Sequence, residues 1–394
     1  MPSINLDNLF SSSGAGRKRR RDEAGQGDGG GDRAPGVAGG EDGGTPGAVR
    51  TIRGLDSPGQ SVVEFQDPLD DLRNFNARKL FDKLNLTDAA FENWLKRIGL
   101  LHSKRTCDCG GRMKLRNPLQ GKKYGMWRCV KKKCGKEKGF LVGTQFEGSA
   151  LPLKEVFQLS YYFSRQTHIQ EEVQFDMQRA DGGTISRETI SDWNNIFREA
   201  CGWHFCNDPV LIGGPGKIVE IDETVVTKRK YHRGALRAEE YWVFGGVERG
   251  DHTKCFLIPV ERRNAETLIP ILSRHIAEGT TIISNGWAAY GGIENIKALQ
   301  SSNKAYSHFT VIHSENFVDP EPGAHTQSIE GTWSHFKARH KEERGTARHL
   351  FASYIYQFMW RRKFKGPDTL YYLWKEISKL YPCQVTSLDD HDDE

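Results

Sequence analysis

The order of strand-like and helix-like segments after Lys217 constrains the fold of this chain more than any other feature. Apolar stretches typical of strands cover 218–221, 241–247 and 254–260, and a helical pattern with buried positions Leu268, Ile269, Leu272 and Ile276 follows. Two more strand-like stretches, 280–284 and 309–312, precede helical patterns at 325–342 and 346–362. Three meandering strands followed by helix, strand, strand and helix predict a mixed α/β sheet with flanking helices.

Polar residues stand at informative points of this pattern. Asp222 follows the first strand-like stretch, and Asn285 follows the stretch 280–284. Strand ends of such a sheet can converge at one edge, where ligands often bind. Glu330, Trp333 and Lys337 are spaced to share one helical face, which could bring a carboxylate and a cation to the same place. Glu223 should point to the opposite side of the sheet from Asp222.

Carboxylates from separate elements are the ligands that divalent metals need in phosphodiester chemistry. Asp222 and Glu330 fit this requirement, while Asn285 stands where a third acid is expected. We therefore predict a metal-dependent phosphoryl-transfer site at these residues. A histidine metal site from His313, Glu315, His325 and His335 is not favoured, because their spacing matches no zinc motif.

Four cysteines in two close pairs predict a structural zinc site. Cys107 and Cys109 are separated by one residue and Cys129 and Cys134 by four, so neither pair has the common two-residue spacing. The alternative is four unrelated buried thiols. The cations of Lys131, Lys132 and Lys133 beside the second pair argue against apolar burial there and could contact phosphate.

The segment 151–210 has the pattern of a helix-turn-helix. A first apolar stripe begins at Leu153, a turn follows at 181–183, and Ser186 caps a helix that buries Ile190, Trp193, Phe197 and Cys201. The opposite face of that helix carries Arg187, Ser191, Asn194 and Arg198, and Arg and Asn are side chains that can pair with base edges. An ordinary solvated helix face is the alternative.

Composition sets the remaining expectations. The net charge is only +5, but basic runs at 17–21 and 337–341 favour a polyanionic partner, as does the aromatic-bearing loop that contains Lys228, Arg229 and Lys230. Residues 1–60 are rich in Gly, Ser, Arg and Asp and are predicted to be disordered, and the run Arg17–Arg21 within them resembles a nuclear import signal. No transmembrane run or signal-peptide pattern is present, so we expect no membrane partner and reduced cysteines.

Three stretches of the sequence closely resemble one family. They are the motifs 221–224, 228–234 and 242–250, the motifs 313–320 and 323–333, and the closing Phe358-Met359-Trp360-Arg361-Arg362-Lys363. They resemble the transposase domain of Merlin-type DNA transposons and their bacterial insertion-sequence relatives, over about residues 104–365.

The resemblance implies an RNase H-like catalytic fold and an acid triad that holds two divalent ions, Mg²⁺ or Mn²⁺. It also implies cut-and-paste transposition at terminal inverted repeats, with transposon ends and target DNA as partners and a homodimer as the active form. The triad positions fall on Asp222, Asn285 and Glu330, and Lys337 matches a basic position. Family members carry Asp at the second position, so Asn285 puts the catalytic competence of this chain in question.

The predicted organisation has six parts: a tail at 1–60, a helical segment at 61–103, a zinc ribbon at 104–150, a helix-turn-helix region at 151–210, an RNase H-like catalytic domain at 217–365, and a C-terminal helix with an acidic tail at 366–394. The leading functional hypothesis is a nuclear DNA transposase. The competing hypotheses are a DNA-binding regulator that has lost cleavage, and an RNase H-like nuclease without strand transfer.

Overall fold

The computed structural model describes residues 67–167, 169–226, 240–299, 303–311, 325–343 and 346–385. The described residues from Pro68 onwards fall in one compact unit. The tail at 1–60 with its basic run, the loop with Lys228, Arg229 and Lys230, and the acidic end of the chain lie outside the described residues.

Short helices begin the described part of the chain. They are η1 (Pro68–Leu72), α2 (Ala77–Leu84) and α3 (Asp88–Arg97). The side chain of Thr87 accepts a hydrogen bond from Ala90 N and caps α3. The apolar face of α3 is buried, and Gly99 has a φ of 77°, which suits the residue that follows a helix end.

A small antiparallel sheet follows these helices. Its strands, in the order β1-β2-β3-β4, are Arg105–Thr106, Arg112–Arg116, Met126–Cys129 and Glu137–Gly139. Its core cluster contains only Cys107, Met113, Trp127 and Cys129, with Cys134 packed against it. Because so small a core contributes little folding energy, this sheet fits a site that is stabilised by a bound metal.

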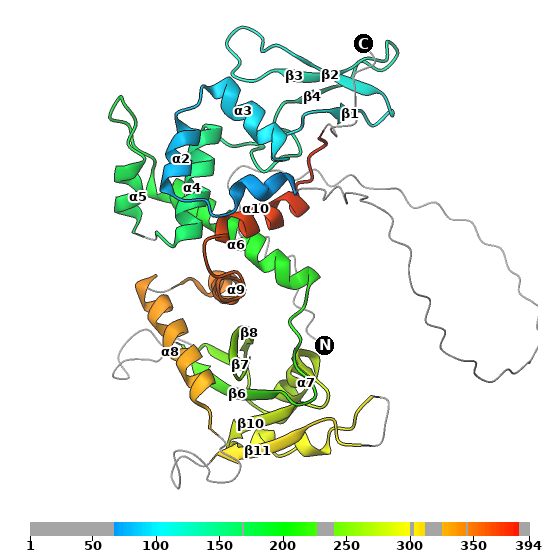
Figure 1. Cartoon of the computed structure of the whole chain (residues 1–394), viewed down its shortest axis with the longest axis vertical. Helices are drawn as coiled ribbons and strands as arrows, with labels where there is room; N and C mark the ends of the chain where they lie inside the picture. The colour runs from blue at the N-terminus through cyan, green and yellow to red at the C-terminus, as the bar shows by residue number, and fades with distance from the viewer. Residues whose placement is uncertain are drawn as a thin grey trace, which may run out of the picture. The chain divides into compact units, whose positions relative to one another are not determined.

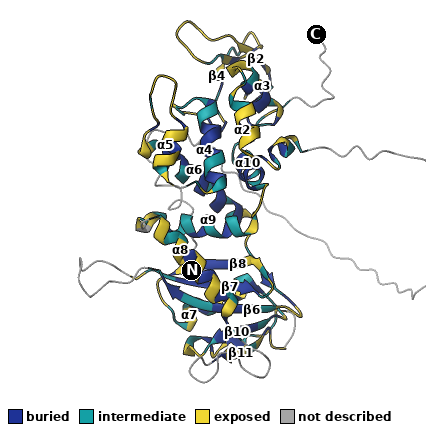
Figure 2. Cartoon of the chain, turned by 60° about the vertical axis from the view of Figure 1, so that its left-hand side comes forward, coloured by how far each residue is buried: buried dark blue, intermediate teal, exposed yellow. Residues whose placement is uncertain are grey.

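Three helices come next: α4 (Leu153–Arg165), α5 (Gln170–Asp176) and α6 (Arg187–Asn207). Ser186 caps α6 by accepting from Thr189 N, and Ile190, Trp193, Phe197 and Cys201 are all buried, so both predictions for α6 are confirmed. The sequence did not predict α5 as a separate helix. Its surface is largely exposed, which weakens the apolar periodicity that marks a helix (Figure 2).

The central sheet has the order β11-β10-β6-β7-β8. The strands in chain order are β6 (Ile218–Val225), β7 (Trp242–Glu248), β8 (Asp251–Val260), β10 (Thr281–Asn285) and β11 (Ser307–Val311). Strands β6, β7 and β8 are antiparallel neighbours, whereas β10 is parallel to both β6 and β11. This mixed sheet is the predicted α/β core and is consistent with an RNase H-like transposase core. A separate short pair joins β5 (Ile212–Gly213) to β9 (Ile276–Ala277).

Helices cover both faces of the sheet (Figure 1). On one face, α7 (Ala265–His275) and the turns η2 (Ala288–Tyr290) and η3 (Ile293–Asn295) pack on Ile221, Phe244 and Phe256. On the other face, α8 (Gln327–Glu342) and, after η4 (Arg348–Leu350), α9 (Phe351–Lys363) pack on Val243, Val247 and Leu257.

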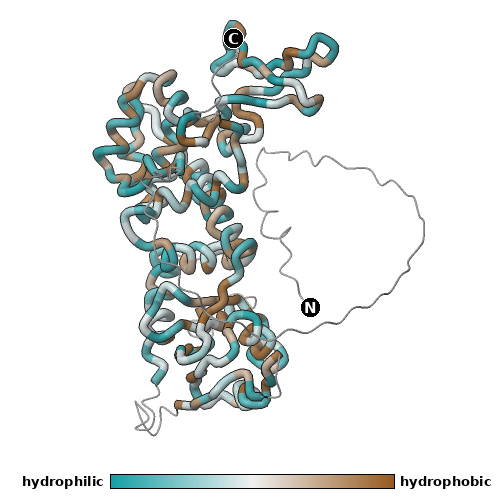
Figure 3. The backbone as a smooth tube through the Cα atoms, turned by 45° about the vertical axis from the view of Figure 1, so that its right-hand side comes forward, coloured by the Kyte–Doolittle hydropathy of each residue, from teal (hydrophilic) through white to brown (hydrophobic). Residues whose placement is uncertain are grey.

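The second of these two cores extends beyond the sheet. It also includes buried residues of α3, α4, α6 and α10 (Thr369–Leu380). Along the helices the tube in Figure 3 changes repeatedly between hydrophobic and hydrophilic residues, as expected of helices with one buried face. Within the described residues, no helix combines the length and apolarity that a membrane span needs.

Candidate functional site

Asp222 lies in the middle of β6, not at its end as the sequence suggested. The strand continues to Val225, because Glu223, Thr224 and Val225 still pair with Phe244, Val243 and Trp242 of β7. The alternation along the strand nevertheless places Asp222 on the face covered by α8. Glu223 faces the opposite side, as predicted, where its carboxylate accepts a hydrogen bond from Tyr290 Oη.

Trp333 of α8 reaches Asp222 across a gap left by a glycine. Its indole Nε1 donates to Asp222 Oδ2 at 3.0 Å. Gly245 is the β7 partner of Asp222, and a Cβ at this position would lie 2.7 Å from the Trp333 ring. Only glycine therefore lets the indole lie over β7 and approach the carboxylate.

Asn285 ends β10 and contacts Asp222 directly. Its Nδ2 donates to Asp222 Oδ1 at 2.9 Å, and its Oδ1 accepts from Trp287 N at 3.1 Å. The backbone N–H of Trp287 fixes which side-chain atom is the oxygen, because the reversed amide would place two donors against each other. The amide thus presents a donor to Asp222, and its only possible metal-ligating atom is already engaged.

Glu220 positions α8, a role that the sequence reading missed. This fully buried carboxylate accepts from Ser328 N at 2.7 Å and Ile329 N at 3.1 Å, so it caps the N-terminus of α8 from a neighbouring strand. Arg249 Nε donates to the same carboxylate at 2.9 Å. Glu220 and Asp222 share one face of β6, so this cap holds the first turn of α8, with Glu330, beside the site. The alternation of side chains between the two faces of the strand along 218–222 could have shown that Glu220 lies on the same face as Asp222.

The pKa of Asp222 is raised to about 7. Burial is the main cause, and the negative charges of Glu223 and Glu330 add to it, while the hydrogen bond from Trp333 opposes it. Glu330 itself is exposed and accepts a hydrogen bond from Thr326 Oγ1 at 2.8 Å. A positive ion beside Asp222 would offset the repulsion from these acids and lower the pKa of Asp222.

Lys337, two turns along α8 from Glu330, lines an open hollow of about 510 Å³ together with Asn285, Trp287, Arg263 and Glu223. The predicted catalytic residues Asp222, Asn285 and Lys337 are thus brought to one region, with Glu330 on the same helix. Asp222 and Glu330 are suitable hard ligands for a divalent ion, but Asn285 turns an N–H towards Asp222. Among the described residues of this region, two acids and one amide therefore stand where the resemblance implies three acids.

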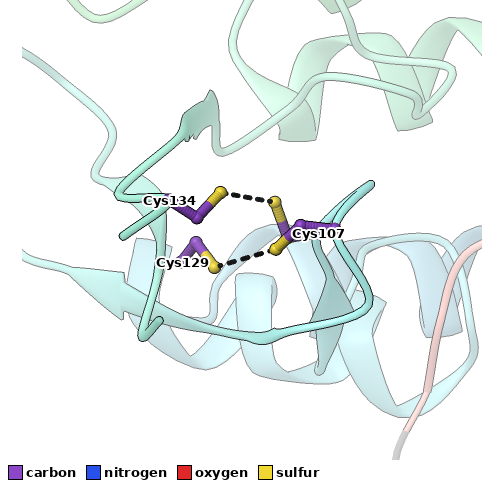
Figure 4. A group of neighbouring side chains, drawn as sticks. Cys107, Cys129 and Cys134 are labelled. Carbon is purple, nitrogen blue, oxygen red and sulfur yellow. Dashed lines mark hydrogen bonds between the residues drawn. The ribbon is translucent and has the colours of Figure 1, made fainter. Parts of the chain in front are cut away.

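The four cysteines of the small sheet form a second cluster, and their sulfur atoms all lie within 4.8 Å of one another. Cys107 Sγ is 3.7 Å from Cys134 Sγ, and Cys109 Sγ is 3.6 Å from Cys129 Sγ. Four sulfurs at about 2.3 Å from a tetrahedral ion would be separated by roughly 3.8 Å, so the geometry fits a bound metal. In Figure 4 the labelled side chains of Cys107, Cys129 and Cys134 point towards a common centre.

Local turns hold this cluster together. Cys107 N donates to Gly111 O and Gly110 N donates to Cys107 O, while Cys134 N donates to Lys131 O in the second turn. A Cβ at Gly111 would lie 3.0 Å from Cys129 Sγ, so the glycine leaves room for the sulfur. A backbone hydrogen bond from Gly111 lowers the pKa of Cys109 to about 7, which favours its thiolate, the form that binds metal.

The four helix residues predicted to read bases line one groove of about 450 Å³. Arg187 forms a 2.8 Å ion pair with Glu171, and Ser191 Oγ accepts from Gln170 Nε2 at 2.9 Å, so α5 covers the first turns of this face. Asn194 is partly exposed.

Arg198 departs from the expectation of an exposed face. It is only 5% exposed, and its guanidinium lies 4.1 Å from the Tyr354 ring. The 21-residue helix α6 runs on against α9, which covers the end of this face. Arg198 is therefore in place to support the packing of α6 on α9 and is not placed to read bases.

The remaining candidates have simpler surroundings. Lys131, Lys132 and Lys133 are exposed, and Lys131 Nζ also donates to Cys109 O at 3.0 Å. His325 lies 3.4 Å from Glu220 through its Nδ1 and belongs to the cap of α8. His313 and Glu315 lie outside the described residues.

Comparison with known proteins finds a family model that matches part of the chain. Residues 213–363 match the family model of the ISXO2-like transposase domain, of the DDE type, which includes the sheet, α8 and α9. This match supports a DNA transposase but not the Merlin subtype. No curated protein matches the chain.

A solved structure is also similar, the cryo-EM structure of the simian T-cell lymphotropic virus intasome in complex with PP2A regulatory subunit B56 gamma. The similarity has 16% identity and a TM-score of 0.24 and covers 45% of this chain and 58% of that chain. The two chains thus superpose poorly.

Proposed function

We propose that this chain is a Merlin-type DNA transposase that binds terminal inverted repeats and descends from enzymes that cleave and join DNA there. The observation that carries the proposal is the meeting of Asp222 and Asn285 at 2.9 Å, beside the helix with Glu330, within the residues that match the transposase domain. In the sequence resemblance, each of these three residues falls on a position of the acid triad of such enzymes.

In this proposal Asp222 and Glu330 are the acids that hold Mg²⁺ or Mn²⁺, two ions per catalytic site in a complete triad. Such ions supply charge stabilisation for the attacking and leaving oxygens of phosphodiester chemistry. Lys337 provides a cation at the hollow, where it can attract a DNA phosphate. Asn285 leaves the site one carboxylate short, so this chain binds DNA ends and cuts them slowly or not at all.

DNA recognition is assigned to two regions. The four-cysteine cluster binds one structural Zn²⁺, and its exposed Lys131, Lys132 and Lys133 contact the DNA backbone. The groove beside α6 presents Arg187, Ser191 and Asn194 to base edges. DNA entry there requires α5 to move or Arg187 to exchange its partner Glu171 for a base.

Two further proposals rest on the sequence resemblance. Two transposon ends require two active sites, so the active form is a homodimer. The basic run Arg17–Arg21 directs the chain to the nucleus, where its DNA substrates lie.

A second function, a DNA-binding regulator without cleavage, is favoured by one observation. The amide of Asn285 donates to Asp222 and so satisfies the carboxylate without a metal. The native chain would then occupy transposon ends and exclude an active relative.

End binding tests the part that both functions share. The terminal sequences that flank the coding region should bind the purified chain, and random duplex of equal length should compete about 10³-fold less well or worse at physiological salt. Equal competition by random duplex contradicts both proposed functions.

A further inference from the structure

Trp287 is held as a rigid, exposed aromatic surface two residues from Asn285. It is 44% exposed, whereas the other eight of the nine tryptophans, all in the described part of the chain, are buried or partly buried. Its backbone N–H donates to Asn285 Oδ1 at 3.1 Å, and its indole Nε1 donates to Arg263 O at 3.1 Å. One hydrogen bond holds the Trp287 backbone and the other holds the indole, so the ring is fixed although its exposure to water is unfavourable.

Arg263 packs against two tryptophan rings and so extends the aromatic surface of Trp287 into a row of three side chains, Trp242, Arg263 and Trp287. Its guanidinium carbon lies 3.7 Å from the Trp242 ring centroid and 5.0 Å from the Trp287 ring centroid. Glu223 Oε1 forms an ion pair with Arg263 Nη1 at 3.5 Å. The ion pair and the two rings immobilise Arg263, so this row is organised before any ligand arrives.

The row borders the 510 Å³ hollow that also contains Asn285 and Lys337. One wall therefore offers a flat π-surface and a planar cation, and another offers an ammonium group. A nucleobase stacks on the first kind of surface, and its phosphate is attracted to the second. A base inside a duplex cannot reach such a wall, because both its faces are already stacked on its neighbours.

We propose that Trp287 stacks on an unpaired base of the DNA strand that occupies this hollow, and that it acts as a positioning residue for the phosphate beside Asp222. The inference rests on the proposed DNA transposase function. The Trp287 backbone N–H is hydrogen-bonded to Asn285 Oδ1, which lies beside Asp222. A base stacked on the indole therefore places its own phosphate next to Asp222. The favoured substrate is an opened or frayed DNA end.

The test uses the full chain and two duplexes of the same arbitrary sequence, one blunt and one with a short single-stranded tail. Fluorescence anisotropy should show tighter binding of the tailed duplex by about tenfold or more, as expected for one stacked base. Trp287→Ala should reduce this ratio to near one, because the tailed duplex loses its stacked base. Trp287→Phe should retain part of it.

Two controls separate stacking from a general effect on folding. Phe81→Ala removes another exposed aromatic residue, on α2, and should keep the full ratio. A 2-aminopurine at the first unpaired position should lose fluorescence on binding to the native chain and keep it with Trp287→Ala. This second readout requires an indole beside the base.

The outcomes distinguish this inference from the proposed function. Equal binding of both duplexes by the native chain, or an unchanged ratio in Trp287→Ala, overturns the stacking site alone. Failure to bind either duplex overturns both the stacking site and the proposed DNA-binding function.

Discussion

Asn285 Nδ2 donates a hydrogen bond to Asp222 Oδ1 at 2.9 Å. The two residues that would share a metal in an acid triad are thus hydrogen-bonded directly to each other. An Asp at 285 could keep the hydrogen bond from Trp287 N with one oxygen and turn the other towards Asp222. The substitution from Asp to Asn thus preserves the local turn while replacing a metal ligand with a donor.

The pKa of Asp222 predicts how stability depends on pH. Burial raises this pKa to about 7, above its unfolded value near 4, so the folded chain pays a penalty for ionising Asp222. Its contribution to stability is complete below about pH 4 and is lost as the pH rises through about 7. Without divalent metal, the unfolding free energy of the native chain should fall by roughly 1–3 kcal/mol more than that of Asp222→Asn between about pH 4.5 and pH 7.5. If the unfolding free energies of the two proteins change with pH in the same way, the raised pKa does not belong to Asp222.

The cysteine cluster predicts one metal ion per chain. Cys109→Ser removes a ligand and should abolish stoichiometric Zn²⁺ in elemental analysis, with loss of the small sheet from its folded state. Cys206→Ser is the matched control, because Cys206 is partly buried and lies outside the cluster. Full zinc content in Cys109→Ser, or none in the native folded chain, would rule out the site.

The α6 groove predicts different effects for two neighbouring positions. Asn194→Ala should weaken binding to the specific end by about 1–3 kcal/mol and leave random DNA nearly unaffected. Arg198→Ala should instead lower the melting temperature, because Arg198 is buried against Tyr354. Lys132→Ala should weaken all DNA about equally. If Asn194→Ala weakens specific and random DNA by the same factor, α6 does not read bases.

The cap of α8 by Glu220 predicts a stability loss coupled to the site. Glu220→Gln removes the charge that accepts from Arg249 and two backbone N–H groups, and should destabilise the chain by about 3–5 kcal/mol. Glu248→Gln is the control: Glu248 is equally buried but pairs with Lys254 and Lys217, away from α8. In an Asn285→Asp background, Glu220→Gln should also abolish cleavage, while Glu248→Gln should retain it. Equal cleavage by the Glu220→Gln and Glu248→Gln variants would contradict the role of Glu220 in positioning α8.

Much of this architecture was predictable because it depends on local periodicity. Apolar runs and helical spacing identified the five strands of the central sheet and the helices after Lys217, and the helix cap Ser186 was visible as a residue type. The convergence of Asp222 and Asn285 was expected from their places at strand ends, but Asp222 lies within β6, and the pairing of β6 with β10 was not predicted.

The surroundings of side chains that depend on long-range packing could not be predicted from the sequence. Arg198 shares the helical face of Asn194, but α9 covers only the later turns, and helical spacing does not reveal this. Glu220 looked like any strand residue, since its role depends on α8 arriving more than a hundred positions later. The exposure of Trp287 and its row with Arg263 likewise arise only in the folded chain.

Cleavage of DNA ends by Asn285→Asp tests the central claim most directly. Charge stabilisation by metal is worth several kcal/mol, and a loss of about 3–5 kcal/mol corresponds to roughly 10²–10⁴ in rate. The native chain should bind its terminal repeats with little or no cleavage, and Asn285→Asp should cut them in Mg²⁺ or Mn²⁺ at least about a hundredfold faster. Adding Glu330→Gln to that variant should abolish the gain without changing metal-free DNA affinity. An Asn285→Asp protein that binds ends tightly but stays inert would contradict the account of an acid site disabled at one position.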